Sequence, residues 1–536
     1  MQDKCFGVML DCSRDAVMKV EKVKEFANTI KAFGYNALLL YTEDTYEVSG
    51  EPYFGYMRGG YTQNELKELD AYLSDIGIEL IPCIQTLAHL LHIFKWKPYA
   101  GICDTGNILL VDDEKTYELI ENIFKTLDKT FTSRRVNIGM DEAHMLGLGK
   151  YLDLHGYHTR FELLKKHLKR VSAIAAKYGF KPMMWSDMYF RVLQDGAYYG
   201  IDNRCEEIVM TDEVASQAPP DVDLVYWDYY NDRNFVDRMV QTHKKFPCRL
   251  WFAGGAWSWF GFVPSNAFTQ KTMLPAMEVC RDKNIDDIFI TMWGDGGKEC
   301  SFFTLLPSLY AIKKTYDGLP VDKEEFSRLT GENYDDLMSL DGPNELYDVE
   351  DPVNPSKYMF YNDLLLGICD TLVVGGECEK LATLTAKYKA AAKRSKKYSY
   401  IFESMASFAS VLSVKYELGV RLRRAYKEKD DVALAECLAD MKKLPPRIKA
   451  FYKAFGKLWE TENKPFGFEV HDQRLGGMIK RIEHCIDKLQ KYIAGTLKTI
   501  EELEVDLLDF HGNGKEFTKK PVHANNWKQI VTCSYI

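Results

Sequence analysis

Short apolar runs alternate with amphipathic stretches along roughly the first 315 residues of the chain. Each run is rich in aliphatic and aromatic residues, and each is followed by a stretch with helical periodicity. Continuous apolar runs separated by helices are typical of strands buried in a parallel sheet. The eight runs are CFGVMLD (5–11), NALLLY (36–41), IELIPCI (78–84), RVNIG (135–139), KPMMWSD (181–187), VDLVYWD (222–228), RLWFAGG (249–255) and DDIFITMW (286–293).

Eight such units predict a closed (β/α)₈ barrel over residues 1–316, and the length suits this α/β fold. A doubly wound open sheet is the alternative, but it needs a glycine-rich phosphate loop after a strand, and the sequence has none. Residues 317–356 are rich in Asp, Gly, Asn and Pro, which predicts a linker. Long helical stretches over 357–536 predict a mostly α-helical C-terminal domain, whose surface could support a homodimer.

Composition and charge narrow the choice of partners. The formal net charge is −9 and the sequence has no basic patch, so nucleic acid is not expected as a partner. No segment approaches the roughly 18 apolar residues of a membrane span, and the N-terminus lacks a cleavable signal pattern. The 13 cysteines show neither CxxC pairs nor the spacing of metal ligands. We therefore expect a cytoplasmic protein with reduced thiols, no membrane contact, no metal and no cofactor.

Polar and aromatic residues gather where the predicted strands end, which is where barrel enzymes carry their functional groups. Carboxylates beside tryptophans suit a sugar, which offers hydroxyls to charged groups and apolar ring faces to indoles. Glycoside cleavage also requires a proton donor for the leaving oxygen. The candidate site residues are Arg14, Glu43, His89, Asp141, Glu142, Trp185, Trp227, Asp228, Tyr229, Tyr230, Trp257, Trp293 and Asp295.

Asp141 and Glu142 are adjacent and follow the fourth predicted strand. Most isolated Asp-Glu pairs are charges at a helix N-terminus, but this position favours a catalytic role. Two carboxylates this close cannot easily flank a sugar as acid and opposing nucleophile. They suit a different arrangement, in which one donates a proton and the other supports a nucleophile that belongs to the substrate.

The motif Gly139-Met-Asp-Glu142, with Arg14 closing the first strand, resembles glycoside hydrolase family 20, the β-N-acetylhexosaminidases. The stretch 61–89 is similar to the second helix and third strand of that family. The usual motif is His-x-Gly-Gly-Asp-Glu, whereas this chain has Asn137 and Met140 in place of the His and the second Gly. We therefore expect a divergent branch, and one without the small N-terminal accessory domain, because the first strand begins at once.

The resemblance implies an exo-acting, retaining enzyme that removes terminal β-linked GlcNAc or GalNAc from oligosaccharides or glycoconjugates. Glu142 would be the general acid and then the general base. Asp141 would orient the substrate's 2-acetamido group, whose carbonyl oxygen attacks the anomeric carbon to form an oxazolinium intermediate. Burial and a negative neighbour would raise the pKa of Glu142, which keeps its proton available.

The resemblance also suggests roles for the other candidates. Arg14 and Asp295 would bind the outer hydroxyls of the terminal sugar, although Arg14 could instead form a structural ion pair with Asp11. The acetamido methyl would lie in a box of tryptophans, unless these belong to the barrel core. The candidates for that box are Trp185, Trp227 and Trp293.

Four further assignments concern the edges of the site. Tyr230, preferred slightly over Tyr229, would donate to the acetamido oxygen, and Asp228 could accept from a sugar hydroxyl. His89 would contact the general acid and continue to an acidic residue, Glu43 or Asp44, unless it is a buried histidine bonded to backbone. Trp257 would form an aglycone platform or merely pack its loop.

Two other functions remain open on the sequence alone. One is a non-catalytic sugar-binding barrel, which the altered motif would support. The other is a barrel glycosidase with a conventional carboxylate nucleophile, Asp187 or Asp295. Residues 459–477 also combine Pro, Gly, aromatic and charged residues; we interpret this stretch as an interhelical turn docked on the barrel, or as a cap over the active site.

Overall fold

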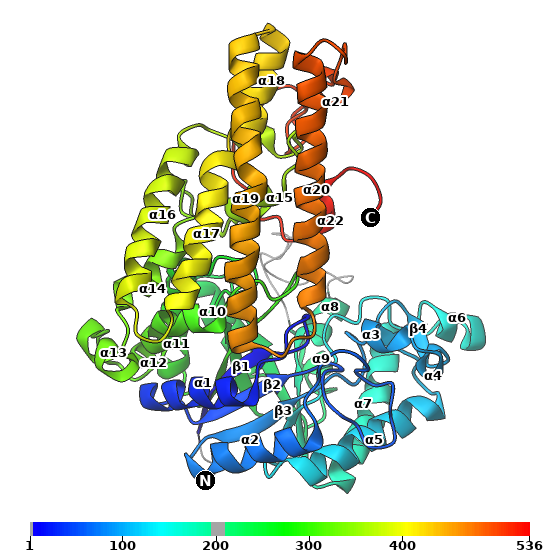
Figure 1. Cartoon of the computed structure of the whole chain (residues 1–536). Coiled ribbons are helices and arrows are strands. Elements are labelled where there is room, and N and C mark those ends of the chain that lie inside the picture. Colours follow the sequence, from blue (N-terminus) through cyan, green and yellow to red (C-terminus); the bar gives the residue numbers. More distant parts are fainter. Residues whose placement is uncertain (1–3, 194–209) are drawn as a thin grey trace. The chain divides into compact units, whose positions relative to one another are not determined.

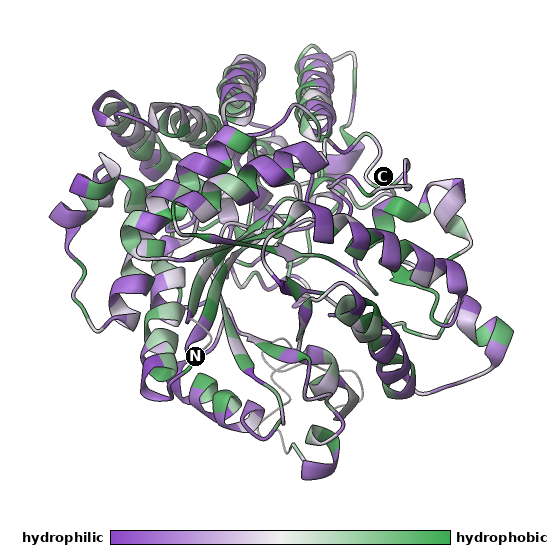
Figure 2. Ribbon diagram, turned by 90° about the horizontal axis from the view of Figure 1, so that it is seen from below, coloured by the Kyte–Doolittle hydropathy of each residue, from purple (hydrophilic) through white to green (hydrophobic). Residues whose placement is uncertain are grey.

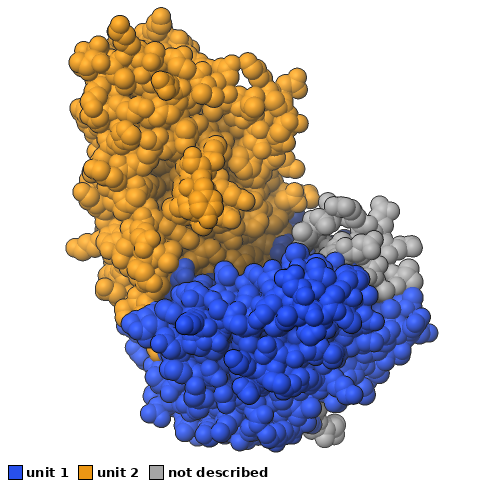
Figure 3. Space-filling view, turned by 90° about the vertical axis from the view of Figure 1, so that its right-hand side faces the viewer, with its two compact units in different colours: residues 1–256, 269–293, 308–321 blue, residues 257–268, 294–307, 322–536 orange. Residues whose placement is uncertain are grey.

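The computed structural model describes residues 4–193 and 210–536, and the chain forms two compact units (Figure 3). The first unit comprises residues 1–256, 269–293 and 308–321. The second comprises residues 257–268, 294–307 and 322–536. Two loops that follow the last two barrel strands are thus grouped with the C-terminal region.

The first unit is a closed barrel of eight parallel strands, which confirms the predicted (β/α)₈ fold (Figure 1). Around the barrel the strands follow one another in sequence order, and the last pairs with the first. The strands are β1 (Cys5–Asp11), β2 (Ala37–Tyr41), β3 (Glu79–Cys83), β6 (Arg135–Asn137), β7 (Lys181–Trp185), β8 (Asp223–Trp227), β9 (Leu250–Gly255) and β10 (Asp287–Met292).

Each predicted apolar run contains one of these strands. The runs identify the strands well because nearly every strand position is buried, as expected when helices cover the outside of a barrel and side chains fill its inside. Figure 2 shows the strands mostly in the hydrophobic colour. Strand β6 is the shortest of the eight, so the residues after Asn137 leave the sheet early.

The helices of the barrel form where an apolar stripe follows a capping residue. In α5 the buried residues Leu119, Ile120, Ile123 and Leu127 recur at helical spacing, and the Asp113 side chain accepts from the second backbone N–H of the helix. The long helices of this region are α1 (Val20–Phe33), α2 (Gln63–Asp75), α5 (Glu114–Thr130), α7 (Arg160–Lys177), α10 (Arg233–His243), α11 (Asn266–Asp282) and α12 (Leu306–Tyr316).

Several short helices and strands lie in the loops that follow the barrel strands. Between β3 and α5 lie two helical turns and a small antiparallel hairpin that the apolar pattern did not predict. The short elements are α3 (Leu91–Phe94), α4 (Lys97–Ala100), β4 (Cys103–Thr105), β5 (Ile108–Leu109), α6 (Lys150–His155), α8 (Asp187–Leu193) and α9 (Asp212–Ala215).

The C-terminal region is helical, as predicted, and α19 and α20 pack side by side within it (Figure 1). Part of the predicted linker is also helical, because α13 and α14 fall inside 317–356. The helices are α13 (Lys323–Thr330), α14 (Tyr334–Met338), α15 (Pro355–Tyr361), α16 (Glu377–Arg394), α17 (Ser399–Lys415), α18 (Leu418–Glu428), α19 (Asp431–Glu462), α20 (Phe468–Ile493), α21 (Glu501–Glu504) and α22 (Trp527–Val531).

Helix α19 continues through Pro445 and Pro446. Proline removes a backbone donor and crowds the preceding turn. The buried stripe continues across this point from Leu444 through Ile448 to Phe451, so packing holds the helix together there. Nowhere in 4–193 and 210–536 is there a helix with the length and hydrophobicity that crossing a bilayer requires.

Candidate active site

The backbone after β6 leaves the sheet through a run of left-handed residues. Gly139, Met140 and Glu142 have φ angles of 73°, 68° and 51°. The Asn137 side chain accepts from the Gly139 N–H at 2.8 Å, and Gln85 Oε1 accepts from the Met140 N–H at 3.3 Å. A left-handed non-glycine residue is strained and persists where its surroundings hold it. A Cβ at position 139 would lie 2.0 Å from Gln85 Oε1, so only glycine fits there.

This turn directs the neighbours Asp141 and Glu142 toward the same partner. Asp141 Oδ2 lies 3.2 Å and Glu142 Oε2 lies 3.7 Å from His89 Nε2. The second oxygen of Asp141 accepts from Gln85 Nε2 at 2.8 Å, and that amide also donates to the Tyr41 hydroxyl at 3.0 Å. Strands that end at one rim of the barrel therefore supply both carboxylates and the groups that hold them.

Asp141 is held in its ionised form. Burial by itself would raise its pKa, but the charge and hydrogen bond of His89, together with the Gln85 bond, outweigh burial and lower it. The pKa of His89 is correspondingly raised to about 9, because the charges of Asp141 and Glu43 outweigh a burial effect that favours the neutral ring. Near neutral pH the pair is thus a carboxylate beside an imidazolium.

The pKa of Glu142 is shifted in the opposite direction. Its pKa is raised, first by burial and then by the negative charge of Asp141, against the weaker effects of His89 and Arg191. Its side chain is nevertheless 39% exposed, so it can reach a molecule in the barrel mouth. A carboxyl group whose pKa is raised and whose side chain remains accessible is suited to general acid catalysis.

Asp187 and Arg191, both on α8, support Glu142. Asp187 Oδ2 accepts from the Glu142 backbone N–H at 3.1 Å and from Arg191 Nε at 2.8 Å. Arg191 Nη2 lies 3.5 Å from Glu142 Oε1. Sequence reasoning proposed Asp187 as an alternative nucleophile and overlooked Arg191, although their spacing of four residues on a helix was a signal for an ion pair. Asp187 is fully buried, which suits a scaffold and not a nucleophile.

Arg14 contacts two carboxylates at the neighbouring strand ends. Its Nη1 lies 3.3 Å from Glu43 Oε1, while its Nε lies 3.8 Å from Asp11 Oδ2. Burial raises the pKa of Glu43 to about 7, although the charges of Arg14 and His89 act against this shift. The Arg14 side chain is 29% exposed, so the guanidinium is positioned by these acids without being enclosed by them.

Aromatic rings line the other side of the barrel mouth. Trp227 stacks on Tyr229 with ring centroids 5.2 Å apart, and Trp293 Nε1 donates to the Tyr229 hydroxyl at 3.1 Å. Trp293 also packs edge-on against Tyr41 at 4.8 Å and lies 6.1 Å from Trp185. The three tryptophans predicted to box the acetamido methyl therefore belong to one cluster of rings.

Comparison with known families accounts for both regions of the chain. The model "Glycosyl hydrolase family 20, catalytic domain" matches residues 6–200, and "Glycoside Hydrolase 20C C-terminal domain" matches residues 335–522. The chain belongs to glycoside hydrolase family 20. This confirms the family resemblance that the Asp-Glu motif indicated.

This family 20 member has distant relatives among curated proteins. Human Hexosaminidase D is 24% identical over 254 residues, which cover 45% of this chain and 49% of the relative. Bovine Hexosaminidase D is 24% identical over 263 residues, covering 46% and 68% respectively. The chain thus spans about half the length of the human relative it matches. The solved exo β-N-acetylglucosaminidase of Vibrio harveyi, in complex with N-acetylglucosamine, is 16% identical, with a TM-score of 0.46, over 64% of this chain and 58% of that one.

Two tyrosines of this family 20 hydrolase differ in their setting. Tyr229 is buried, and the pKa of its hydroxyl is raised by burial, with Asp141 among the charges that add to this shift. Tyr230 is 38% exposed. This geometry favours Tyr229, and not Tyr230 as the sequence suggested, as the donor beside Asp141; both assignments stay predictions.

The remaining candidates are Asp228, Trp257 and Asp295. Asp228 accepts from the Tyr226 hydroxyl and from the backbone and side chain of Asn231, so its oxygens are occupied within its own turn. Trp257 and Asp295 belong to the second unit. Trp257 is buried and stacks on Trp259 at 4.2 Å, as a loop-packing residue would. In the part of the chain that the structure describes, no group of three or more His, Cys, Asp or Glu side chains could hold a metal ion.

Proposed function

We propose that the protein is an exo-acting, retaining β-N-acetylhexosaminidase that uses the substrate's acetamido group as nucleophile. The observation that supports this most is that the pKa values of two adjacent carboxyl groups are shifted in opposite directions. The pKa of Asp141 is lowered and that of Glu142 is raised, and both side chains lie beside His89. Pairs of titratable groups pushed apart in this way often divide the roles of acid and base.

In the first step Glu142 donates its proton to the glycosidic oxygen as the bond to the anomeric carbon breaks. The acetamido carbonyl oxygen attacks that carbon, and the ring nitrogen of the resulting oxazolinium becomes positive. Ionised Asp141 accepts from the acetamido N–H and stabilises this charge. Tyr229 donates to the acetamido oxygen and fixes its direction of attack.

In the second step a water molecule attacks the anomeric carbon and reopens the oxazolinium. Glu142, now ionised, accepts a proton from this water, and the acetamido group is restored. Two inversions at the anomeric carbon give overall retention. Both steps require the same pair, so neither carboxyl group can be replaced by the other.

The surrounding residues support recognition of a terminal N-acetylhexosamine. The rings of Trp185, Trp227 and Trp293 supply apolar contact for an acetamido methyl group. Arg14 and Glu43 together offer donors and acceptors for the outer hydroxyls. The conventional double-displacement alternative has less support, because Asp187 is fully buried and bonded to Arg191.

The direct experiment compares 4-nitrophenyl β-glycosides of GlcNAc, GalNAc and glucose. We expect turnover of one or both N-acetylated substrates, and no turnover of the glucoside, which lacks the nucleophile. A thiazoline that mimics the oxazolinium should inhibit competitively. Comparable hydrolysis of the glucoside would indicate a carboxylate nucleophile, and binding of GlcNAc glycosides without turnover would indicate a non-catalytic barrel.

A further inference from the structure

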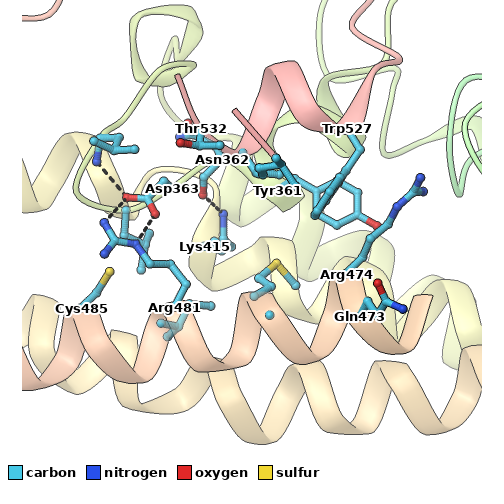
Figure 4. A pocket seen from close by; sticks show the side chains of 17 residues that line it. Tyr361, Asn362, Asp363, Lys415, Gln473, Arg474, Arg481, Cys485, Trp527 and Thr532 are labelled. Carbon is cyan, nitrogen blue, oxygen red and sulfur yellow. Dashed lines mark hydrogen bonds and ion pairs between the residues drawn. The ribbon is translucent and has the colours of Figure 1, made fainter. Parts of the chain in front are cut away.

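The second unit contains a cavity of about 460 Å³ that the proposed reaction does not use (Figure 4). All of its lining residues belong to that unit. They come from the end of α15 and the residues after it, from the last residue of α17, from α20, and from α22 with the residues after it. Cavities of this size, when largely apolar with a few polar groups, are typical sites for small molecules.

The cavity is lined by both apolar and polar side chains. The apolar ones are leucine, methionine, isoleucine and valine residues. At one end lie Asp363, Lys415 and Arg481, and at the other lie Arg474 and Trp527 (Figure 4).

The polar groups at the first end form hydrogen bonds within the protein. Asp363 accepts from Arg481 Nε at 2.6 Å and from the backbone N–H groups of Leu365 and Leu366 at 2.9 Å each. Lys415 donates to the carbonyl oxygens of Met359 and Asn362. The polar groups at this end therefore have their hydrogen-bond partners inside the protein.

The second end offers a donor and an excess of positive charge. Trp527 Nε1 is buried and makes no hydrogen bond within the described residues. The Arg474 guanidinium lies 5.3 Å from the Trp527 ring. Among the described residues it pairs with the Glu299 carboxylate at 3.4 Å, which also pairs with Lys357 at 2.8 Å, so two cations share one carboxylate. A ligand at this end would have to supply an acceptor, preferably a negative one.

A glycine in the middle of α20 opens the cavity wall. Gly476 and Gly477 are consecutive, and glycine is the least favourable residue after proline in a helix interior. A Cβ on either would meet no atom within 4 Å, so packing does not require glycine at these positions. Gly477 lines the cavity and Gly476 does not. The missing side chain at 477 leaves room for a molecule against the helix backbone.

We propose that this cavity binds a small organic acid with an apolar body. Its carboxylate accepts from Trp527 Nε1 beside the Arg474 guanidinium, and its apolar body extends over Gly477 toward the leucine and isoleucine side chains. The site is independent of the chemistry proposed for the barrel.

Titration calorimetry of the full chain with 4-phenylbutyrate and with 4-phenylbutan-1-ol tests the proposal, since the two probes share a body and differ in the carboxylate. We expect the acid to bind at least about tenfold more tightly than the alcohol, a ratio that corresponds to about 1.4 kcal/mol. Equal affinity for both probes, or binding of neither at millimolar concentration, would overturn the proposal.

Paired glycine variants locate the site. Gly477→Leu should weaken binding of 4-phenylbutyrate at least tenfold, whereas the matched Gly476→Leu should leave it unchanged; both replace glycine with a better helix former. Trp527→Phe keeps an aromatic ring and removes the Nε1 donor. It should weaken binding of 4-phenylbutyrate and leave the affinity for 4-phenylbutan-1-ol unchanged. Unchanged affinity of folded Gly477→Leu, judged by circular dichroism, would contradict the assignment.

Discussion

Two buried clusters of charge in this molecule differ in their balance. In the second unit, Glu299 lies between Lys357 and Arg474, so its single negative charge faces two positive ones. At the barrel mouth the carboxyl groups outnumber the cations. The acids there are Asp11, Glu43, Asp141, Glu142 and Asp187, and the bases are Arg14, His89 and Arg191.

This difference indicates that the Glu299 cluster stabilises the fold and that the barrel-mouth cluster is the one suited to catalysis. In the Glu299 cluster the positive charges outnumber the negative one, so no like-charged carboxylates compete there. In the barrel, burial and negative neighbours disfavour the ionised form of some carboxyl groups. The raised pKa values of Glu43 and Glu142 are the result, and only Glu142 combines this with an accessible side chain.

The largest expected effect comes from substituting either member of the Asp141–Glu142 pair. Glu142→Gln and Asp141→Asn should each lower kcat/KM for a GlcNAc aryl glycoside by about 10³-fold, because one removes the proton donor and the other the charge that stabilises the oxazolinium. Steady-state kinetics measure the loss, with circular dichroism to show that each variant is folded. Near wild-type turnover in either variant would remove that residue from the mechanism.

Breaking the Glu299 cluster should instead affect stability. Lys357→Met leaves Glu299 without its closest partner, and removing one partner of a buried pair typically lowers the free energy of unfolding by about 3–5 kcal/mol. Both side chains are almost fully buried, with 1% and 0% exposed. Denaturant titration measures the change. The surface pair Lys457–Glu403 provides a control, since Lys457→Met should have little effect.

The charge of His89 makes barrel stability depend on pH. Its pKa in the fold is about 9, above the ordinary value of 6.5, so the stabilisation from protonated His89 is complete below pH 6.5 and is lost as the pH rises through 9. His89→Gln should therefore lose less stability than the wild type between pH 6.5 and 9. Urea titrations at both pH values measure this, with His144→Gln as an exposed-histidine control. An identical loss in His89→Gln and the wild type would show that His89 is not charged in the fold.

The smallest effect separates the two tyrosines. Tyr229→Phe should lower kcat by about 10-fold, the size expected when one hydrogen bond to the reacting oxygen is lost, while Tyr230→Phe should change it less than about threefold. The reverse order would restore the assignment made from the sequence.

The sequence revealed the barrel because its strands are buried on both sides and therefore read as continuous apolar runs. It also placed Asp141 and Glu142 correctly at a strand end. Gln85 and Arg191 were missed, because their importance depends on hydrogen bonds to residues 45 or more positions away. The choice between Tyr229 and Tyr230 depends on the turn that Asp228 closes, which no periodicity describes.

The division of labour between the two adjacent carboxyl groups can be tested by varying the leaving group. Rates for GlcNAc glycosides with 2,4-dinitrophenol, 4-nitrophenol and phenol as leaving groups should be measured for wild type, Glu142→Gln and Asp141→Asn. If Glu142 donates the proton, its variant should retain most activity on the dinitrophenyl substrate and lose progressively more as the leaving group becomes more basic. Asp141→Asn should lose a similar factor on all three. The same leaving-group dependence in both variants would contradict the assignment of Glu142 as acid and Asp141 as support for the acetamido group.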